Sequence, residues 1–316
     1  MSGPLGSSQW MYKSGETIDW GGVRMINAGG TTGNGNSAAG DANSIDYVNA
    51  SGANADSADF GDLSAVRISL GAVSSTGRVV FLGGNPSYVN IMEYITPATT
   101  GNVTDFGDMS PGGAMHGHQV SSGIRGCFSY SRSGVSYSDE IDYITIASTG
   151  NSSTFGDLDQ GRGGPSGSSN GVRGLFWAGN INATPAHNKY IQYITIASTG
   201  NATTFGNMVR IVTAHSACGN ADRNISMGGH YGSLQDTIEY VNPASTSDTS
   251  DFGNLLAASY MVQGAETAVR GLVSGGYGPV SYDNTIQYVT FATTGNATDF
   301  GNMTVGRYSH ASGSGA

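Results

Sequence analysis

A Phe-Gly pair returns six times along this chain of 316 residues, at nearly constant intervals. The intervals are 46, 49, 50, 47 and 48 residues, and they separate Phe60, Phe106, Phe155, Phe205, Phe252 and Phe300. A period of about 40–50 residues that contains short β-like segments is typical of propeller blades, because one small sheet cannot bury its faces alone. The interval therefore predicts an all-β propeller of six blades over residues 21–316, preceded by an N-terminal extension at residues 1–20.

Each repeat contains the same short segment, in which an acid or amide and a tyrosine stand between two apolar residues. These segments cover residues 45–48, 92–95, 141–144, 191–194, 238–241 and 286–289. Such alternation predicts a half-buried strand. The Phe-Gly pair follows the tyrosine by 12 or 13 residues, after a turn such as Gly101-Asn102. The two segments are therefore predicted to form a hairpin, as the third and fourth strands of a four-stranded blade.

The two ends of the chain are incomplete repeats that complement each other. The chain opens with a segment of the second-strand type around 23–27 and ends with one of the first-strand type around 303–312, which resembles 208–217. The first blade is predicted to be built from both termini. Such closure removes exposed sheet edges and ties the ends of the chain together.

An arginine occupies the second-strand segment of every repeat, and from the second repeat on it stands 18 or 19 residues after the preceding phenylalanine. The six are Arg24, Arg78, Arg125, Arg173, Arg223 and Arg270. Because each comes from a different blade, they are predicted to be structural, pairing with a neighbouring acid or with backbone carbonyls where blades meet. An anion-binding role is the alternative.

Almost all variation in repeat length lies between this arginine and the tyrosine, where the spacing runs from 16 to 23 residues. The loop between the second and third strands is therefore variable, and it is predicted to emerge on the same face as the fourth-to-first connection. Variable loops on a constant scaffold usually carry binding. The candidate binding residues are the aromatic ones in and beside these loops, with local packing as the alternative: Tyr88, Tyr137, His187, Tyr190, Tyr231, Tyr277 and Tyr282.

Catalytic and metal-binding patterns are weak in this sequence. His116, His215 and His310 lie ten residues after a phenylalanine in alternate repeats, and on an innermost strand they would approach the axis, where they could hold a metal or an anion. No carboxylate is in register with them, so no metal or other cofactor is predicted. Glycoside hydrolysis needs two opposed carboxylates, whereas the acids here repeat with the blades. Zinc-helix and phosphate-loop motifs do not occur. The protein is predicted not to be an enzyme, and a propeller glycosidase is the least favoured alternative.

Charge and hydropathy exclude several partners. The net charge of −10 and only 13 scattered Lys and Arg residues argue against nucleic acid. No run approaches the ~18 apolar residues of a membrane span, and the first residues lack the pattern of a signal peptide. Cys127 and Cys218 are predicted to be buried thiols without a disulfide.

Two resemblances give an expectation about function. The segment from His215 to Phe252 resembles a kelch repeat, which implies four-stranded blades with the first strand innermost, although Phe stands here in place of the Trp of that family. The run 193–208 is similar to repeats in structural proteins of tailed bacteriophages, especially marine ones. This similarity implies a virion component on the tail or capsid, assembled in the host cytoplasm, with other virion proteins as partners and a host-surface glycan as a further one. A glycan-binding adhesin module is the alternative.

Overall fold

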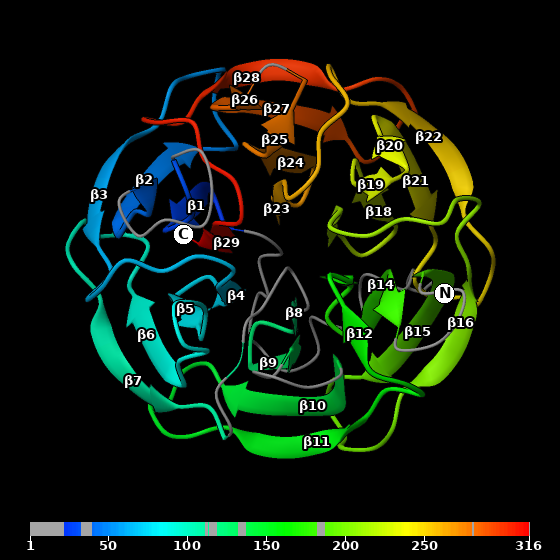
Figure 1. Cartoon of the computed structure of the whole chain (residues 1–316), viewed down its shortest axis with the longest axis horizontal. Coiled ribbons are helices and arrows are strands. Elements are labelled where there is room, and N and C mark those ends of the chain that lie inside the picture. The colour runs from blue at the N-terminus through cyan, green and yellow to red at the C-terminus, as the bar shows by residue number, and fades with distance from the viewer. Residues whose placement is uncertain are drawn as a thin grey trace, which may run out of the picture.

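Six antiparallel sheets of four strands surround a common axis in the computed structural model (Figure 1). The structure describes residues 22–32, 40–110, 113, 119–131, 137–181, 187–279 and 281–315. These residues contain no α-helix, so the prediction of an all-β, six-bladed propeller is confirmed. The predicted extension at residues 1–20 lies outside the described residues.

Each blade consists of four main strands, which follow one another from the axis outward. Blade 1 contains β29 (Ala311–Gly315), β1 (Arg24–Ala28), β2 (Ser44–Asn49) and β3 (Ala58–Asp62). Blade 2 contains β4 (Gly71–Ser75), β5 (Arg78–Leu82), β6 (Ile91–Ile95) and β7 (Thr104–Asp108). Blade 3 contains β8 (Gln119–Ser121), β9 (Arg125–Ser131), β10 (Tyr137–Thr145) and β11 (Ser153–Asp157).

The second half of the ring has extra short strands. Blade 4 contains β13 (Ser166–Ser169), β14 (Arg173–Ile181), β15 (His187–Thr195) and β16 (Thr203–Asn207), with β12 (Arg162–Gly163) also paired to β14. Blade 5 contains β17 (Ser216–Gly219), β18 (Asn224–Met227), β21 (Thr237–Val241) and β22 (Ser250–Asn254). Blade 6 contains β23 (Gln263–Glu266), β24 (Arg270–Ser274), β27 (Thr285–Thr290) and β28 (Thr298–Asn302). Two small hairpins stand between second and third strands, β19 (His230–Tyr231) with β20 (Ser233–Leu234) and β25 (Tyr277–Gly278) with β26 (Ser281–Tyr282).

The C-terminal strand closes the ring. β29 pairs antiparallel with β1, so that Arg24 lies opposite Gly315 and Ala28 lies opposite Ala311, and the red and blue ends of the chain share blade 1 in Figure 1. This closure was predicted. The predicted bounds of the first strands, 303–312 and 208–217, were wrong, because β29 and β17 begin only at residues 311 and 216. The residues before them form a connecting loop that contains a left-handed residue, such as Ser309 at φ 52°, and a strand does not accommodate that conformation.

The repeated Tyr and Phe form the interior of each blade. In all six blades the tyrosine ring of the third strand meets the phenylalanine ring of the fourth edge-on, at centroid distances of 5.7–6.0 Å. The phenylalanines are fully buried. The guanidinium group of the repeated arginine lies 4.3–4.8 Å from the tyrosine centroid of its own blade. Edge-on packing and a cation over a ring are both favourable arrangements.

The same six arginines join each blade to the next. Each donates a hydrogen bond from Nη1 to a main-chain carbonyl just beyond the third strand of the following blade, and the bond from blade 6 returns to blade 1. The acceptors, in the order Arg24 to Arg270, are the carbonyls of Pro97, Ile146, Ile196, Pro243, Phe291 and Ala50, the last together with Gly52. These arginines thus contact carbonyls of the neighbouring blade.

The glycine of each Phe-Gly pair lies where the outer turn of the next blade presses on it. A Cβ at Gly206 would lie 2.0 Å from the carbonyl oxygen of Ser247 in blade 5. Beside it, the amide of Asn207 donates to Oδ1 of Asp248 at 2.8 Å. The other five blades repeat this clasp, with Asn or Asp at the turn. The recurring Phe-Gly pair and Gly-Asn turn are therefore two halves of one contact between blades.

Two further expectations concern cysteines and membrane spans. Cys127 and Cys218 are buried and free of disulfides, as predicted. No helix formed by the described residues is long and apolar enough to cross a membrane.

We expect Gly206→Ala to lower the free energy of unfolding by about 1–3 kcal/mol, because the added methyl group overlaps the carbonyl of Ser247. Gly77→Ala is the matched control, since nothing lies within 4 Å of its Cβ position. Denaturant unfolding of both variants measures the difference. Equal stability of the two variants would show that the outer turn does not press on the Phe-Gly pair.

Removal of residues 311–316 should cost several kcal/mol, at about 0.5–1.5 kcal/mol for each lost hydrogen bond, and should expose the edge of β1. Removal of Ala316 alone is the control. Thermal melting followed by circular dichroism tests this expectation, and a cooperative transition at the parental temperature in the longer truncation would contradict ring closure by β29.

Candidate functional site

One face of the ring carries both the second-to-third and the fourth-to-first loops, and we name it the loop face. Main-chain bridges join the two kinds of loop, at Ile68 with Asn85, Thr213 with His230, and Tyr260 with Tyr277. The prediction that both kinds of loop share a face is therefore confirmed. Neighbouring blades together present one continuous surface on this side.

Buried arginines in the fourth-to-first loops hold these loops in place. Arg67, Arg210 and Arg307 donate to the carbonyl of the glycine that begins the next second-to-third loop, at 2.7–3.1 Å. Each also pairs with the acid beside the repeated tyrosine, Arg67 with Glu93 and Arg307 with Asp46 among them. Burial lowers the pKa of these arginines, and the neighbouring carboxylate partly offsets that effect.

Sequence reasoning missed these arginines, although Arg67 and Arg307 each stand seven residues after a repeat phenylalanine, as does a further buried arginine, Arg162.

The acids that pair with the loop arginines are not free for catalysis. Glu239 contacts Nε of Arg210 at 3.1 Å and Asp46 contacts Nη2 of Arg307 at 3.3 Å, and both acids are buried. A carboxylate that compensates a buried cation is not available as one of a catalytic pair.

A cup of about 310 Å³ opens on the loop face. It is bounded by loops from blades 2 to 6, and its lining is formed by Asn85, Tyr88, Tyr137, Gly163, Gly164, Asn180, Thr213, Ala214, His230, Tyr260 and Met261. None of the described residues in this lining is Lys, Arg, Asp or Glu. The described lining is therefore uncharged, with aromatic rings beside amide and hydroxyl groups.

Beside the cup, five rings form a continuous series that we name the aromatic array: His230, Tyr260, Tyr277, Tyr282 and Tyr308. Successive rings meet at centroid distances of 5.3–5.8 Å, and Tyr282 stacks on Tyr308 with an interplanar angle of 13°. Burial is the first cause of raised pKa values at Tyr260 and Tyr308, with nearby tyrosines as further causes. Their hydroxyl groups therefore stay protonated near neutral pH.

The structure separates the seven aromatic candidates into groups. Tyr88 and Tyr137 line the cup, and Tyr277 and Tyr282 belong to the aromatic array. His187 and Tyr231 pack edge-on at 5.3 Å, outside both. Tyr190 is 47% exposed and has no ring contact within the described part of the chain.

Three members of the aromatic array were not predicted. Tyr260 and Tyr308 lie eight residues after repeat phenylalanines, in the fourth-to-first loops. These loops have a constant length, so a search for loops that vary in length passes over them. His230 directly follows the glycine pair of blade 5. An alignment of the six repeats by the phenylalanine marks would have shown the two tyrosines.

The histidines proposed for the axis lie elsewhere. His215 and His310 are buried just before β17 and β29, at the position that Leu70 and Val262 occupy in the cores of other blades. Burial lowers the pKa of both, that of His215 to about 3, with a nearby arginine as the second cause. His116 lies outside the described residues. The described residues contain no group of three or more His, Cys, Asp or Glu that could hold a metal.

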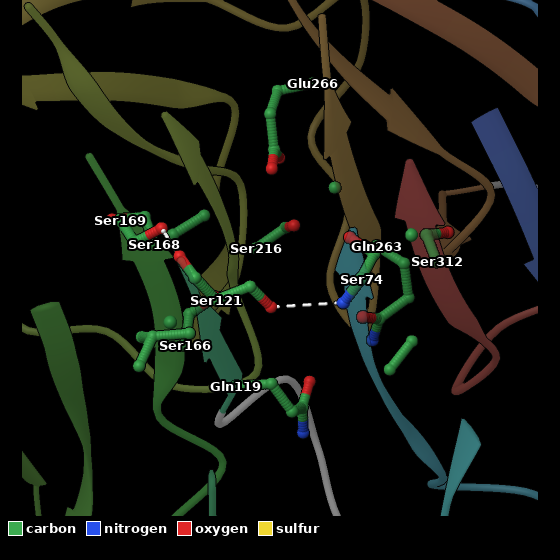
Figure 2. Close-up of a pocket in the computed structure, with 16 residues that line it drawn as sticks. Ser74, Gln119, Ser121, Ser166, Ser168, Ser169, Ser216, Gln263, Glu266 and Ser312 are labelled. Carbon is green, nitrogen blue, oxygen red and sulfur yellow. Dashed lines mark hydrogen bonds between the residues drawn. The ribbon is translucent and has the colours of Figure 1, made fainter. Parts of the chain in front are cut away.

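The axial channel is narrow and lined mainly by serine. Its volume is about 50 Å³, enough for a few water molecules. Serine hydroxyls bridge the innermost strands of neighbouring blades, where the amide of Ser74 donates to Oγ of Ser121 at 3.1 Å and that of Glu266 donates to Oγ of Ser314 at 2.9 Å. Figure 2 shows serine side chains directed into the channel. The serines therefore act as links between blades.

Among the described residues that line the channel, Glu266 is the one carboxylate (Figure 2). Burial raises the pKa of its carboxyl to about 7. Glycoside hydrolysis needs two opposed carboxylates, and the described lining supplies only Glu266.

The face opposite the loop face carries exposed aliphatic side chains. Val23, Ile124, Val172 and Val269 each directly precede one of the six repeated arginines, and they are 42–60% exposed. The last three lie at turns between first and second strands, and Val23 lies just before β1. We name this set the aliphatic ring. Because four blades place an aliphatic residue at the same point, the side chains surround the axis on that face.

The sequence matches no protein-family model and no curated protein. A propeller fold does not by itself define a function, because one fold hosts many unrelated sites. The loop face and the aliphatic ring are therefore the basis for a functional conclusion.

Glu266→Gln should remove a pH dependence of stability. The folded-state pKa lies above that of the unfolded chain, so stability is complete below pH ~4.5 and declines as pH rises toward ~7, by up to about 3 kcal/mol. The variant should therefore unfold at a higher temperature than the parent at pH 8 and at the same temperature at pH 4.5. Identical pH profiles for both proteins would contradict a raised pKa at this carboxyl.

Proposed function

We propose that this protein is a non-enzymatic binding propeller of a tailed-phage virion, attached to the tail or capsid, whose loop face makes contact with the host surface. The observation that carries the proposal is the aromatic array beside an uncharged cup. Tyrosine combines an apolar ring with a polar tip, which is why it is enriched in recognition surfaces.

The array is suited to binding because its rings are already held by one another. Tyr277 is 38% exposed and meets the rings of Tyr260, Tyr282 and Tyr308. Side chains fixed before binding lose little conformational entropy when a partner arrives. The array therefore offers a preorganised surface.

The aliphatic ring supports attachment through the opposite face. Its exposed Val and Ile side chains surround the axis, where a neighbouring virion protein would cover them. Attachment there leaves the loop face directed outward. The virion assignment itself is supported by the similarity of residues 193–208 to repeats of phage structural proteins, and by a closed ring whose remaining sheet edges are short.

A non-enzymatic role is supported by the ion pairs that the repeated acids form. The repeated acids Asp46, Glu93 and Glu239 compensate buried arginines, and no acid is among the described residues that line the cup. These observations favour binding over a propeller glycosidase, which needs two free carboxylates in one cleft.

The two faces can be tested separately on assembled particles. We expect Val172→Glu combined with Val269→Glu to abolish incorporation, because a buried unpaired charge is costly at an interface. Tyr277→Ala should leave incorporation intact and slow attachment of particles to host cells roughly tenfold, equivalent to about 1.4 kcal/mol. Tyr190→Ala, which removes an exposed tyrosine outside the array, is the matched control.

Imaging of the intact particle gives the measurement of incorporation. A six-bladed ring seated on its aliphatic face supports the proposal. Full incorporation of the double glutamate variant would show that the orientation is wrong, and the absence of any such ring from the particle would show that the protein is not a virion component.

A further inference from the structure

We propose that the cup on the loop face is a binding site for a neutral saccharide, with Tyr88 and Tyr137 as the aromatic platforms. The inference deepens the host-contact part of the proposed function and rests on it. It assigns to this contact both a chemical class of ligand and a place, the cup, which shares His230 and Tyr260 with the array.

The size and chemistry of the cup fit one sugar residue. Its volume of about 310 Å³ lies at the small end of ligand pockets, which run from about 300 to 1,000 Å³. The C–H groups of a pyranose ring carry partial positive charge and pack on the negative face of an aromatic ring. Sugar hydroxyls need both donors and acceptors, and the lining supplies amide, hydroxyl and imidazole groups.

The absence of charge from the lining selects among saccharides. None of the described residues that bound the cup is Lys, Arg, Asp or Glu, so the described lining offers no cation to pair with a sialic acid, a uronic acid or a sulfated sugar. The net charge of −10 on the chain adds general repulsion of anions. A neutral hexose is therefore the favoured ligand class.

The ring of Tyr137 packs against Gly163, whose lack of a side chain leaves room for the ring in one orientation. A Cβ at Gly163 would lie 2.1 Å from Cε1 of the Tyr137 ring, so the ring rests directly on the glycine backbone. Both residues line the cup. A ring fixed in this way keeps one orientation toward a ligand.

Tyr88 has a strained backbone that blade architecture does not explain. Among the described residues, Ser87 and Tyr88 have φ of 71° and 52°, a conformation that bulky residues seldom adopt. The other non-glycine residues with positive φ occupy positions that repeat from blade to blade, namely Ser69, Ala178, Ala214, Met261 and Ser309. Strain that is peculiar to one loop is often kept where it places a functional side chain.

The amide groups of the lining are oriented by their neighbours. Oδ1 of Asn85 accepts a hydrogen bond from the amide of Tyr88 at 3.4 Å, and Oδ1 of Asn180 bonds to Nδ1 of His187. In both cases the Nδ2 group has no partner within the described part of the chain. Two amide donors thus remain for ligand hydroxyls.

The test uses the purified full chain and, as probes, the methyl α- and β-glycosides of glucose, galactose, mannose and N-acetylglucosamine, titrated calorimetrically. We expect at least one of them to bind with a millimolar dissociation constant, as is usual for a ligand of this size. Sialyllactose should bind more weakly than the best neutral probe. Tyr88→Ala and Tyr137→Ala should each weaken binding at least tenfold, whereas Tyr190→Ala should change it less than twofold.

Folding and binding can be told apart in these variants. Tyr137→Phe keeps the ring on Gly163 and removes one hydroxyl, so it should melt like the parent and weaken binding by a smaller factor than alanine. Binding that is unaffected by both alanine variants, or stronger binding of sialyllactose, overturns the assignment. Failure of all neutral probes, with the ring still found on the particle, overturns the saccharide site alone; sugar binding by a protein absent from the particle overturns the virion proposal alone.

Discussion

Six arginines, one at the start of each second strand, hydrogen-bond to main-chain carbonyls of the following blade and so join the sheets into a closed ring. A hydrogen bond from a charged donor contributes about 1.5–3 kcal/mol, and here each donor also lies over a tyrosine ring of its own blade. The repeated phenylalanine packs against the same tyrosine, so that arginine, tyrosine and phenylalanine are in contact in each blade. Blade interior and blade contact are therefore built from one set of residues.

Neighbouring blades are also joined at the outer rim, through smaller groups. The glycine after each phenylalanine admits the turn of the next blade, and an Asn or Asp at that turn accepts its neighbour's amide. At the axis, serine hydroxyls take over this role. Since backbone amides pair with Asn or Asp side chains at the rim and with serine hydroxyls at the axis, the ring holds together with only 11% charged residues.

The loops on one face are free to vary because the scaffold does not depend on them. Buried arginines such as Arg67 and Arg307 fix the two ends of a variable loop, through the glycine that begins it and the first residue of the following strand. Between these ends, blades 5 and 6 add small hairpins, and blade 2 adopts the left-handed turn that places Tyr88. Differences between blades thus create an asymmetric cup and array on a nearly symmetric ring.

The sequence by itself determined the six blades, the Tyr-Phe hairpins, the closure by the C-terminal strand and the face that varies, because each depends on spacing along the chain. Only the tertiary structure decided which aromatic residues meet. Tyr88 and Tyr137 are neighbours of one cup although 49 residues separate them, and Tyr308 stacks on Tyr282 from a loop of constant length. The positions of His215 and His310 were likewise decided by packing, which keeps them in the blade cores and away from the axis. Spacing reveals what repeats in every blade, whereas a binding surface forms where several blades differ, and only the closed ring brings those differences together.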